Sequence, residues 1–467
     1  MKHRNSKGLT GAAVTPNRVL LVLFCLILLV GPACRWEQVH GILSRINAPQ
    51  FPNRDFNITD YGAVSDGQTD CTEAFEKAIS AAHKTGGGRV LVPAVTFLTG
   101  PIHLRSNVNL HISEGAVIRF SVDPNKYLPV VYTRFEGIEC MNYSPLIYAY
   151  EQENIAITGK GILDGQASNE NWWRWKNTQA DDVKALGNQG QTGVPVQQRV
   201  YGAGKKLRPN MIQPYKCKNV LIEGVTIRNS PMWHIHPLLS TNVIVRNVKV
   251  IGHGPNNDGC NPESCKDVLI VGCYFDTGDD CIAIKSGRNN DGRRVNVPSE
   301  NIIIQDCEMR EGHGGVTIGS EMTGGARNIF AENCTMDSPN LDRALRIKTN
   351  SVRGGTVENI FLRNITIGQV AEAVVSIDFY YGEGNTGNYP PTVRNINLEN
   401  ITSGKSKYAL LIKGYERSPV TDIRLKDCTF NNVEKSNILA GVKNLTLENV
   451  KINGEVLVEN SKSKIQN

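Results

Sequence analysis

The chain has 467 residues, 40% of them hydrophobic, and this content allows a substantial buried core in one large domain or several smaller ones. Its formal net charge is +6, but four cations precede an apolar segment near the N-terminus, and without them the net charge is about +2. These four are Lys2, Arg4, Lys7 and Arg18. A strong basic field is therefore excluded, and nucleic acid is not an expected partner.

The N-terminal segment predicts export. Residues 19–30 form an unbroken apolar run behind the basic residues, and Gly31-Pro32-Ala33 supplies small residues for cleavage. Because the run is short for a membrane span, the sequence predicts a signal peptide over residues 1–33. The alternative is an uncleaved signal anchor in a membrane of the secretory pathway. Six Asn-x-Ser/Thr sequons fit a secreted glycoprotein of the extracellular space or cell wall, some of them in positions too crowded for modification. They begin at Asn57, Asn142, Asn333, Asn364, Asn400 and Asn444.

The chain has 12 cysteines, of which Cys25 lies in the apolar run and Cys34 just beyond the expected cleavage point. In an oxidising compartment we expect some of the others to pair, although their spacing does not show which. No CxxC pair with matching His or Cys spacing is present, so we expect no zinc site. Nothing else in the sequence indicates a metal or a cofactor.

After a short leader over residues 34–50, the first regular element is a helix. Phe75, Ala78, Ile79 and Ala82 follow helical spacing and predict a helix over residues 72–82, which a glycine-rich turn ends. The next residues, 89–97, alternate in the manner of an extended strand.

A repeated theme follows: an Asn or Asp, a short strand of alternating β-branched residues, and a polar or glycine turn. From Asn219 onward the starts of this theme lie 22 to 36 residues apart, which is typical of a solenoid. The constant place of the Asn or Asp argues against a sandwich or a propeller. We therefore expect an all-β fold: a right-handed parallel β-helix, in one domain over residues 51–460, with residues 461–467 as a tail. Asn side chains should stack at one corner, and the helix over residues 72–82 should cover the N-terminal end.

Two segments interrupt the repeat. Residues 166–207 are long and polar and contain three tryptophans beside two cations, and residues 287–299 contain three arginines. The first group is Trp172, Trp173 and Trp175 with Arg174 and Lys176. In a solenoid such insertions become loops on one face, often the binding face. The tryptophan segment is either a sugar-binding surface or a solvated loop.

Three carboxylates stand at a separation of about one coil. Asp258 and Asp279 are 21 residues apart, and Asp280 follows directly. Residues one coil apart lie on neighbouring strands, so the three can share one cleft. Crowded carboxylates cannot all ionise freely, so one pKa should rise and leave a general acid beside a general base.

A histidine and two cations follow at similar spacing. His313 and Arg346 are 33 residues apart, which corresponds to one longer coil. Arg346 and Lys348 point the same way on a strand. The two cations either form a structural ion-pair network with the carboxylates or hold a carboxylate of the substrate.

The ordered motifs resemble those of the polygalacturonases, the pectin-cleaving glycoside hydrolases of family 28. They read Asn257-Asp258, Gly278-Asp279-Asp280-Cys281, Gly312-His313-Gly314 and Arg346-Ile347-Lys348. The resemblance covers nearly the whole chain beyond residue 50, including the start Asn57-Ile-Thr-Asp-Tyr-Gly-Ala. It implies a right-handed parallel β-helix and hydrolysis of α-1,4 links between galacturonates, with inversion at the anomeric carbon.

The resemblance also implies a role for each motif. Asp279 would be the general acid, and Asp258 with Asp280 would activate the water. His313 would support the protonation of the acid. Arg346, Lys348, Tyr381 (or Tyr380) and Asn256 would bind the substrate. The more common family motif Asn-Thr-Asp reads Asn256-Asn257-Asp258 here. Inversion requires an acid and a base about 6.5–9.5 Å apart, with a water between them.

The mode of attack is expected from the longer loops. The interval between Asp280 and His313, together with Gly319-Ser320-Glu321-Met322, resembles exo-acting and plant-type members of the family. We therefore expect a secreted, monomeric exo-polygalacturonase whose partner is pectic galacturonan, with no stable membrane association unless the signal segment is retained. The alternatives are a hydrolase of rhamnogalacturonan or xylogalacturonan, a β-elimination lyase and a non-catalytic wall-binding protein.

Overall fold

The computed structural model describes residues 1, 3 and 32–457. The chain divides into two compact units, Met1–Ile42 and Leu43–Asn467. The helix α2 (Pro32–Leu43) occupies much of the segment expected as a short leader. The expected signal peptide lies mostly, and the C-terminal tail wholly, outside the described residues. Within the described ranges, no helix combines the length and apolar character needed to cross a membrane.

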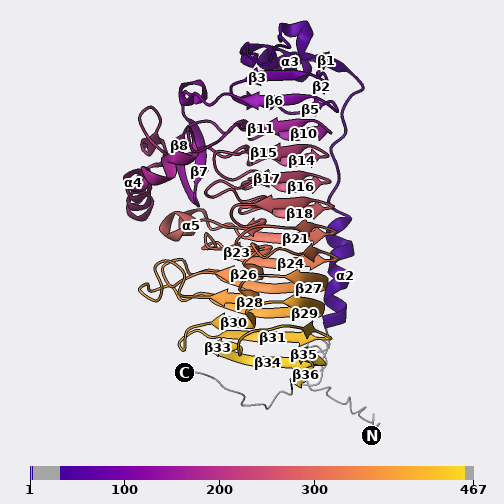
Figure 1. Cartoon of the computed structure of the whole chain (residues 1–467), viewed down its shortest axis with the longest axis vertical. Helices are drawn as coiled ribbons and strands as arrows, with labels where there is room; N and C mark the ends of the chain where they lie inside the picture. Colours follow the sequence, from indigo (N-terminus) through magenta and orange to yellow (C-terminus); the bar gives the residue numbers. More distant parts are fainter. Residues whose placement is uncertain (2, 4–31, 458–467) are drawn as a thin grey trace. The chain divides into compact units, whose positions relative to one another are not determined.

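The second unit is a stack of parallel β-coils, drawn in chain order from indigo to yellow in Figure 1. Its largest sheet joins 24 strands among the described residues. These are β1 (Asp55–Asn57), β2 (Gly88–Val92), β3 (Thr96–Thr99), β5 (Val108–Ile112), β6 (Val117–Phe120), β10 (Glu153–Gly159), β11 (Ile162–Asp164), β14 (Lys218–Glu223), β15 (Thr226–Arg228), β16 (Thr241–Arg246), β17 (Lys249–Gly252), β18 (Lys266–Val271), β19 (Tyr274–Thr277), β21 (Ser299–Gln305), β22 (Glu308–Met309), β24 (Ala326–Glu332), β25 (Thr335–Met336), β27 (Thr356–Gln369), β29 (Thr392–Lys405), β31 (Val420–Lys426), β32 (Thr429–Phe430), β34 (Val442–Glu448), β35 (Val450–Ile452) and β36 (Glu455–Leu457).

Shorter strands form the other faces of the coils. One face holds β20 (Ile282–Ile284), β23 (Val316–Gly319), β26 (Arg343–Lys348), β28 (Ala373–Asp378), β30 (Tyr408–Lys413) and β33 (Ile438–Ala440), and a second set is β4 (Ile102–His103), β9 (Ile147–Tyr150) and β13 (Ile212–Tyr215). Another three-stranded sheet holds β7 (Val131–Phe135), β8 (Ile138–Asn142) and β12 (Val200–Tyr201). The parallel β-helix expected from the repeat is confirmed.

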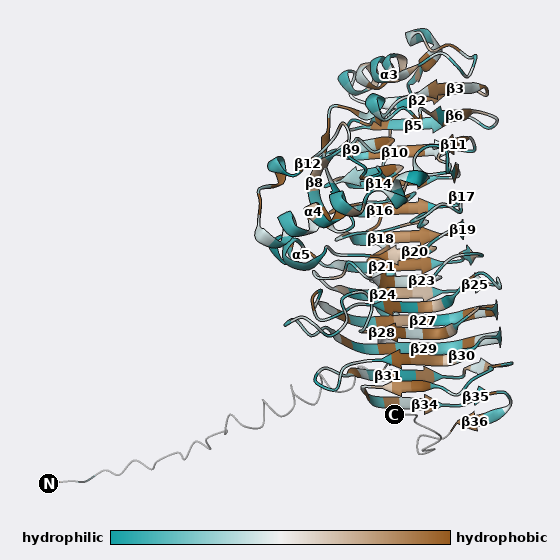
Figure 2. Ribbon diagram, turned by 60° about the vertical axis from the view of Figure 1, so that its left-hand side comes forward, coloured by the Kyte–Doolittle hydropathy of each residue, from teal (hydrophilic) through white to brown (hydrophobic). Residues whose placement is uncertain are grey.

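Apolar residues stack in register inside the coils. Ile222 of β14 pairs with Val245 of β16, which pairs with Ile270 of β18, and all three are at most 2% exposed. Figure 2 shows the corresponding hydrophobic bands along the strands. Each such side chain contributes about 1.5–3 kcal/mol on burial, so the rows hold the coils in register.

Asn side chains form the expected ladder at one corner. The Asn219 amide donates to Asn154 (2.8 Å), and the Asn242 amide donates to Asn219 (2.7 Å). These residues have positive φ angles of 53° to 57°, a conformation that Asn tolerates better than most residues. The repeated Asn therefore turns the chain and joins one coil to the next.

Several expected sequons lie in such ladders or in the interior. Asn364 donates to Asn333 (3.2 Å), and Asn400 donates to Asn364 (2.8 Å). Asn142 is buried and donates to the carbonyl of Leu207. The crowding expected at some sequons is present.

The helix over residues 72–82 is confirmed as α3 (Thr72–Lys84), which lies at the N-terminal end of the stack (Figure 1). Its apolar face is buried. Two 3₁₀ turns, η1 (Ile58–Tyr61) and η2 (Pro124–Tyr127), lie near this end.

The expectation that some cysteines form disulfides is wrong for the described part of the chain. Ten cysteines there are buried free thiols. Cys273, Cys307 and Cys334 each follow an Asp, Asn or Gly at a turn and point inward like the Val or Ile of other coils. These three residues act as small apolar core residues. Burial raises the pKa of other cysteines, for example that of Cys217 to about 12.

Both insertions contain helices that sequence periodicity did not indicate. The first holds η3 (Trp173–Asn177), α4 (Ala180–Thr192) and η4 (Val196–Gln198), and the second holds α5 (Asn289–Val295). Figure 1 shows α4, α5 and the antiparallel pair β7–β8 projecting from the same side of the stack. The insertions thus gather on one face, as expected.

Two of the three tryptophans of the first insertion, Trp172 and Trp175, are buried packing residues. Trp172 is 1% exposed and packs edge-on against Trp175 and Tyr127. Trp173 is partly buried and donates to the carbonyl of Ser230 (2.9 Å). The hypothesis of sugar stacking is therefore not supported for Trp172 and Trp175, which are buried, whereas Lys176 of the same segment lines the cavity described below.

Candidate active site

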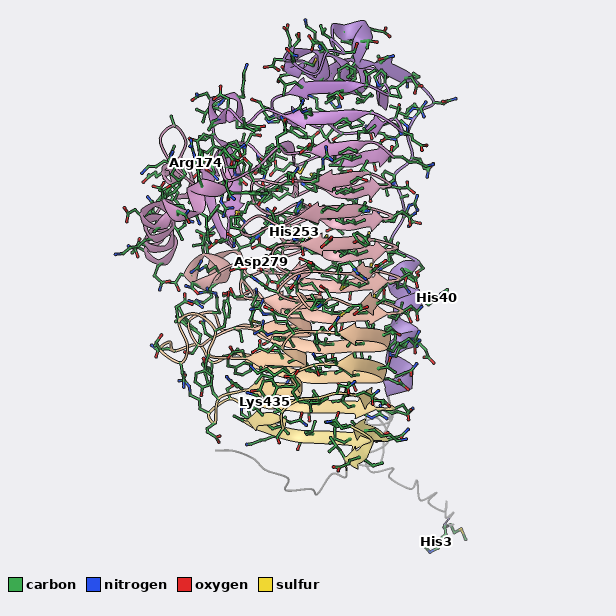
Figure 3. All side chains as sticks on the ribbon, in the orientation of Figure 1. His3, His40, Arg174, His253, Asp279 and Lys435 are labelled. Carbon is green, nitrogen blue, oxygen red and sulfur yellow. The ribbon has the colours of Figure 1, made fainter. Side chains whose placement is uncertain are left out.

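The three carboxylates meet at one end of the short strand β20. Cys260 pairs with Ile282 of β20, so by the same register Asp258 lies level with Asp280. The Gly259 amide donates to the Asp280 carbonyl (2.9 Å), and the His313 amide donates to the Asp279 carbonyl (3.1 Å). Three successive coils therefore converge here, on the side from which the insertions project (Figure 3 labels Asp279).

Asp280 is held as an anion. The Lys348 ammonium donates to its Oδ2 (2.7 Å), and the Arg346 guanidinium (3.1 Å) and Thr317 hydroxyl (3.0 Å) donate to its Oδ1. Burial alone would raise the pKa of Asp280, but Lys348 and Arg346 hold it well below its usual range.

Asp279 forms a pair with His313. His313 Nδ1 lies 3.0 Å from Asp279 Oδ1, and 17% of the Asp279 side chain is exposed to the cavity beside it. Burial opposes ionisation, yet the hydrogen bond with His313 and the charge of Lys348 lower the pKa of Asp279. The same hydrogen bond raises the pKa of His313.

Asp258 is the carboxylate whose pKa rises. It is 2% exposed, and burial and the charge of Asp279 raise its pKa well above the usual value, although Lys285 acts in the opposite direction. Its Oδ2 accepts a hydrogen bond from the Asn261 amide (2.7 Å) and lies 3.5 Å from the Lys285 ammonium. One of the three pKa values rises, as expected, but it is that of Asp258 and not that of Asp279, the expected general acid.

Arg346 and Lys348 lie side by side on β26, as expected, but Arg346 is not level with His313. Arg346 pairs in register with Thr317, because the coil between these strands is 29 residues long and not 33. The Arg346 guanidinium still reaches the His313 carbonyl (3.5 Å). The cations therefore join the carboxylate cluster through their side chains.

Of the two tyrosine candidates, Tyr381 lies at the site. Its ring is 5.8 Å from the Arg346 guanidinium and 5.4 Å from the Lys348 ammonium. Tyr380 instead packs edge-on against Tyr415, with ring centroids 5.0 Å apart.

A cavity of about 270 Å³ opens above these groups. Asn256 lines it, and its side-chain oxygen accepts a hydrogen bond from Arg208 (2.7 Å). Asn257, in contrast, is buried and fixes the local turn through the Gly254 amide and the Ser230 and Met232 carbonyls.

Sequence reasoning missed a buried cation beneath the cavity. The Lys285 ammonium donates to Glu321 (3.0 Å) and lies 4.5 Å from the centre of the Trp233 ring. All three residues line the cavity. The available signal was the alternation Ile282-Ala283-Ile284-Lys285, which turns Lys285 to the outer face of the strand that follows Asp280.

Sequence reasoning also missed four residues that line the cavity and are joined by ion pairs, here called the ion-pair wall: Glu136, Arg288, Arg353 and Glu383. Arg288 pairs with Glu136 (3.2 Å) and Glu383 (3.6 Å), and Arg353 pairs with Glu383 (2.8 Å). The wall joins the tip of β7–β8, the start of α5 and the loop after β28. Arg288 alone was noted, as part of an insertion.

A buried polar network supports the wall. Glu139 of β8 contacts Arg294 and Tyr215 and accepts a hydrogen bond from Tyr132 (2.8 Å). Arg134 of β7 pairs with Glu139 (3.7 Å). These contacts fasten the hairpin both to α5 and to the coils.

The network predicts a pH-dependent stability. Burial opposes ionisation of Glu139, but Arg134 and hydrogen bonds from Tyr215 and Arg294 hold its pKa at about 2, against 4.5 for an ordinary glutamate. Its contribution is therefore complete above pH 4.5 and is lost as the pH falls from 4.5 toward 2. Glu139→Gln should remove on the order of 3 kcal/mol from the unfolding free energy at pH 7 and flatten its fall below pH 4.5. Urea unfolding between pH 3 and 7 measures both.

The control for this experiment is Glu151→Gln, which alters an exposed carboxylate paired with Lys216. It should leave the pH dependence close to that of the native protein. A Glu139→Gln variant with undiminished pH dependence would contradict the assignment.

One cluster outside the cavity has metal-ligating side chains. His253, Asp276 and Glu311 each place one potential ligand atom within 4.8 Å of the other two. His253 Nε2 lies 3.3 Å from Asp276, and Nδ1 lies 3.6 Å from Glu311, so contacts of the histidine ring with the two carboxylates account for the arrangement. Figure 3 labels His253 near Asp279.

The fold and the carboxylate cluster define a class of protein, the glycosidases that act through paired carboxylic acids. The match is specific: the model of the glycosyl hydrolases family 28 covers residues 89–454, and the chain belongs to this family. A rhamnogalacturonase A/epimerase, pectate lyase-like model also matches residues 56–111.

Relatives and solved structures agree. The structure of a hyperthermoactive exopolygalacturonase from Thermotoga maritima is 49% identical, covers 91% of this chain and 97% of that chain, and has a TM-score of 0.88. A probable polygalacturonase of Vitis vinifera is 29% identical, with 90% of this chain and 83% of the relative covered. An exo-poly-alpha-D-galacturonosidase of Dickeya chrysanthemi is 28% identical, with 86% and 74% covered. The protein is a polygalacturonase-type glycosidase with a right-handed parallel β-helix.

Proposed function

We propose that the protein removes single galacturonates from the non-reducing end of polygalacturonate, by acid–base hydrolysis with inversion. The observation that supports this most directly is the ion-pair wall, which lines the cavity that contains Asp258 and Asp279 and which we infer to close one side of it. A polymer cannot continue through a closed wall, so the terminal sugar occupies the cavity and the remaining chain leaves along the open sheet face. The exopolygalacturonase of Thermotoga maritima, at 49% identity, supports the same mode.

Asp279 is the proposed general acid. It must be protonated when the leaving oxygen departs, and its hydrogen-bonded partner His313 is the source of that proton. A sugar placed over Asp279 removes it from water, which raises the pKa of a carboxyl group. The proton then moves from His313 Nδ1 along the 3.0 Å contact to Asp279 Oδ1.

Asp258 and Asp280 are the proposed water-activating pair, with different tasks. Asp280, fixed by Lys348 and Arg346, supplies a constant negative charge. Asp258, when ionised, accepts the proton of the water, because its raised pKa gives it a high proton affinity. The water attacks the anomeric carbon from the face opposite the leaving group, which inverts its configuration.

Arg346 and Lys348 are proposed to bind the uronate carboxylate next to the scissile bond, with Tyr381 beside them and Asn256 at the cavity edge. Their charges exceed that of Asp280, so the cluster retains attraction for a substrate anion. The catalytic domain is taken as residues 51–460, and the protein as a secreted monomer acting on wall pectin. The apolar run at residues 19–30 supports export, with a retained anchor as the alternative.

A time course of products tests the function. Polygalacturonate digested by the native protein should give galacturonate from the first minutes, whereas a ladder of oligomers would contradict the exo mode. Opening the wall with Arg288→Ala should introduce di- and trigalacturonate among the early products, since two of its ion pairs are lost. Arg327→Ala, which removes an exposed pair with Glu300 on the large sheet, is the matched control. Fragments of rhamnogalacturonan and xylogalacturonan in parallel digests test the alternative substrates.

A further inference from the structure

A second hollow lies on the sheet face beyond the carboxylates. It has a volume of about 80 Å³, and Arg343, Ser376 and Lys413 are among its lining residues. Lys348 and Tyr381 line both this hollow and the larger cavity. The two spaces therefore adjoin, and a substrate chain leaving the closed cavity passes over the hollow.

The register of the strands explains why the floor is hollow. Arg346 of β26 pairs with Ser376 of β28, which pairs with Leu411 of β30. The short serine side chain leaves a depression between two longer neighbours. Lys348, Asp378 and Lys413 form the parallel column, so Lys413 lies two strands, about 10 Å, beyond Lys348.

Among the cations that line this hollow, Lys413 differs from the others in that it forms no ion pair within the described residues. Arg346 and Lys348 bind Asp280, and Arg343 pairs with Glu372 and Asp342. The Lys413 side chain is exposed, and within residues 32–457 its ammonium has neither a hydrogen bond nor an ion pair. An exposed, unpaired ammonium at the edge of a depression is suited to an anionic group of a bound chain.

We propose that Lys413 binds the carboxylate of the third galacturonate, counted from the non-reducing end, while the sugar lies over Ser376. This subsite rests on the proposed function, in which the first galacturonate fills the closed cavity and the second lies at Arg346 and Lys348. The subsite makes the activity depend on the length of the substrate, because a trimer gains a contact that a dimer lacks.

The experiment compares digalacturonate with trigalacturonate as substrates. For Lys413→Met, kcat/KM for the trimer should fall about 3- to 5-fold, the range of an exposed ion pair, and kcat/KM for the dimer should not change. Lys413→Glu should reduce kcat/KM for the trimer further, because repulsion between two carboxylates replaces attraction. Lys443→Met, an exposed lysine of β34 on the large sheet, is the matched control and should alter neither substrate.

A modified substrate isolates the contact. A trimer whose reducing-end carboxyl is methyl-esterified lacks the anion that Lys413 is proposed to bind. For the native protein, esterification of the trimer should lower kcat/KM by the same factor as the substitution Lys413→Met lowers it for the unmodified trimer. For Lys413→Met, kcat/KM should be the same for the esterified and the unmodified trimer. Equal loss on dimer and trimer, or a variant that still prefers the free carboxylate, would overturn the subsite.

Failure of the proposed function has a different signature. If the native protein cleaves neither oligomer, the proposal of exo activity is wrong. The subsite is then tested by calorimetric titration, which measures the affinity for each oligomer. Tighter binding of trimer than dimer that is lost in Lys413→Met would sustain it. Equal binding in both proteins would refute it.

Discussion

Asp279→Asn is expected to lower kcat on polygalacturonate by about 10²–10⁴-fold without unfolding the protein. An amide cannot give a proton to the leaving oxygen, so the chemical step loses its acid. The fold should persist, because the substitution removes one of three crowded carboxylates and still allows a hydrogen bond with His313. Release of reducing sugar measures the loss, and thermal unfolding checks the fold. Activity near that of the native protein would refute the role.

The acid role has a signature that simple loss of activity lacks. An aryl galacturonide with a good leaving group departs without protonation, so Asp279→Asn should lose much less activity on it than on the polymer. Asp258→Asn should lose activity on both, because attack by water still requires a base. Asp276→Asn is the control, since Asp276 lies on β19 close by in sequence but contacts His253 outside the cavity.

Lys348→Met is expected to lower the unfolding free energy by about 3–5 kcal/mol and to reduce activity strongly. The ammonium is 2.7 Å from Asp280 Oδ2, and its loss leaves a buried anion with only Arg346 and Thr317 as partners. The pKa of Asp280 should rise and its fixed charge should weaken. Denaturant unfolding and kcat/KM measure the two effects.

A second substitution separates stability from chemistry. Adding Asp280→Asn to Lys348→Met removes the unpaired anion, so the double variant should regain much of the lost stability but none of the activity. Lys348→Arg should retain most stability, because the positive charge remains. A double variant no more stable than Lys348→Met would show that lost packing, and not the buried charge, dominates.

The sequence predicted the coils well because their causes are local and periodic. The Asn that begins each strand marks a corner of the coil, and the alternation of Val and Ile marks the residues that point into the core. The apolar residues of α3 follow helical spacing. The insertions lack such periodicity. Trp172 is buried because Trp175 and Tyr127 pack against it, which the sequence alone does not indicate. The sequence likewise does not show that Cys273 points into the core.

Within the site, sequence order identified the groups but not their pairing. Asp258, Asp279 and Asp280 are found by their motifs, whereas the choice of Asp258 as the group with the raised pKa depends on its full burial and on the neighbouring charges of Asp279 and Asp280, which outweigh the nearby Lys285. Lys285 and the ion-pair wall come from coils and loops that no motif links. Glu136 and Glu383 are 247 residues apart in the chain, yet both contact Arg288.

The Asn ladder sets where this protein can change during evolution. Asn154 and Asn219 bond across 65 residues as closely as Asn219 and Asn242 do across 23. One corner thus keeps a constant step while the opposite side accepts loops of very different length. New specificities can therefore arise by exchange of loop sequence alone, with the stack unaltered, and transplanting the residues between Asn154 and Asn219 into a related enzyme is a practical route to altering its cleft.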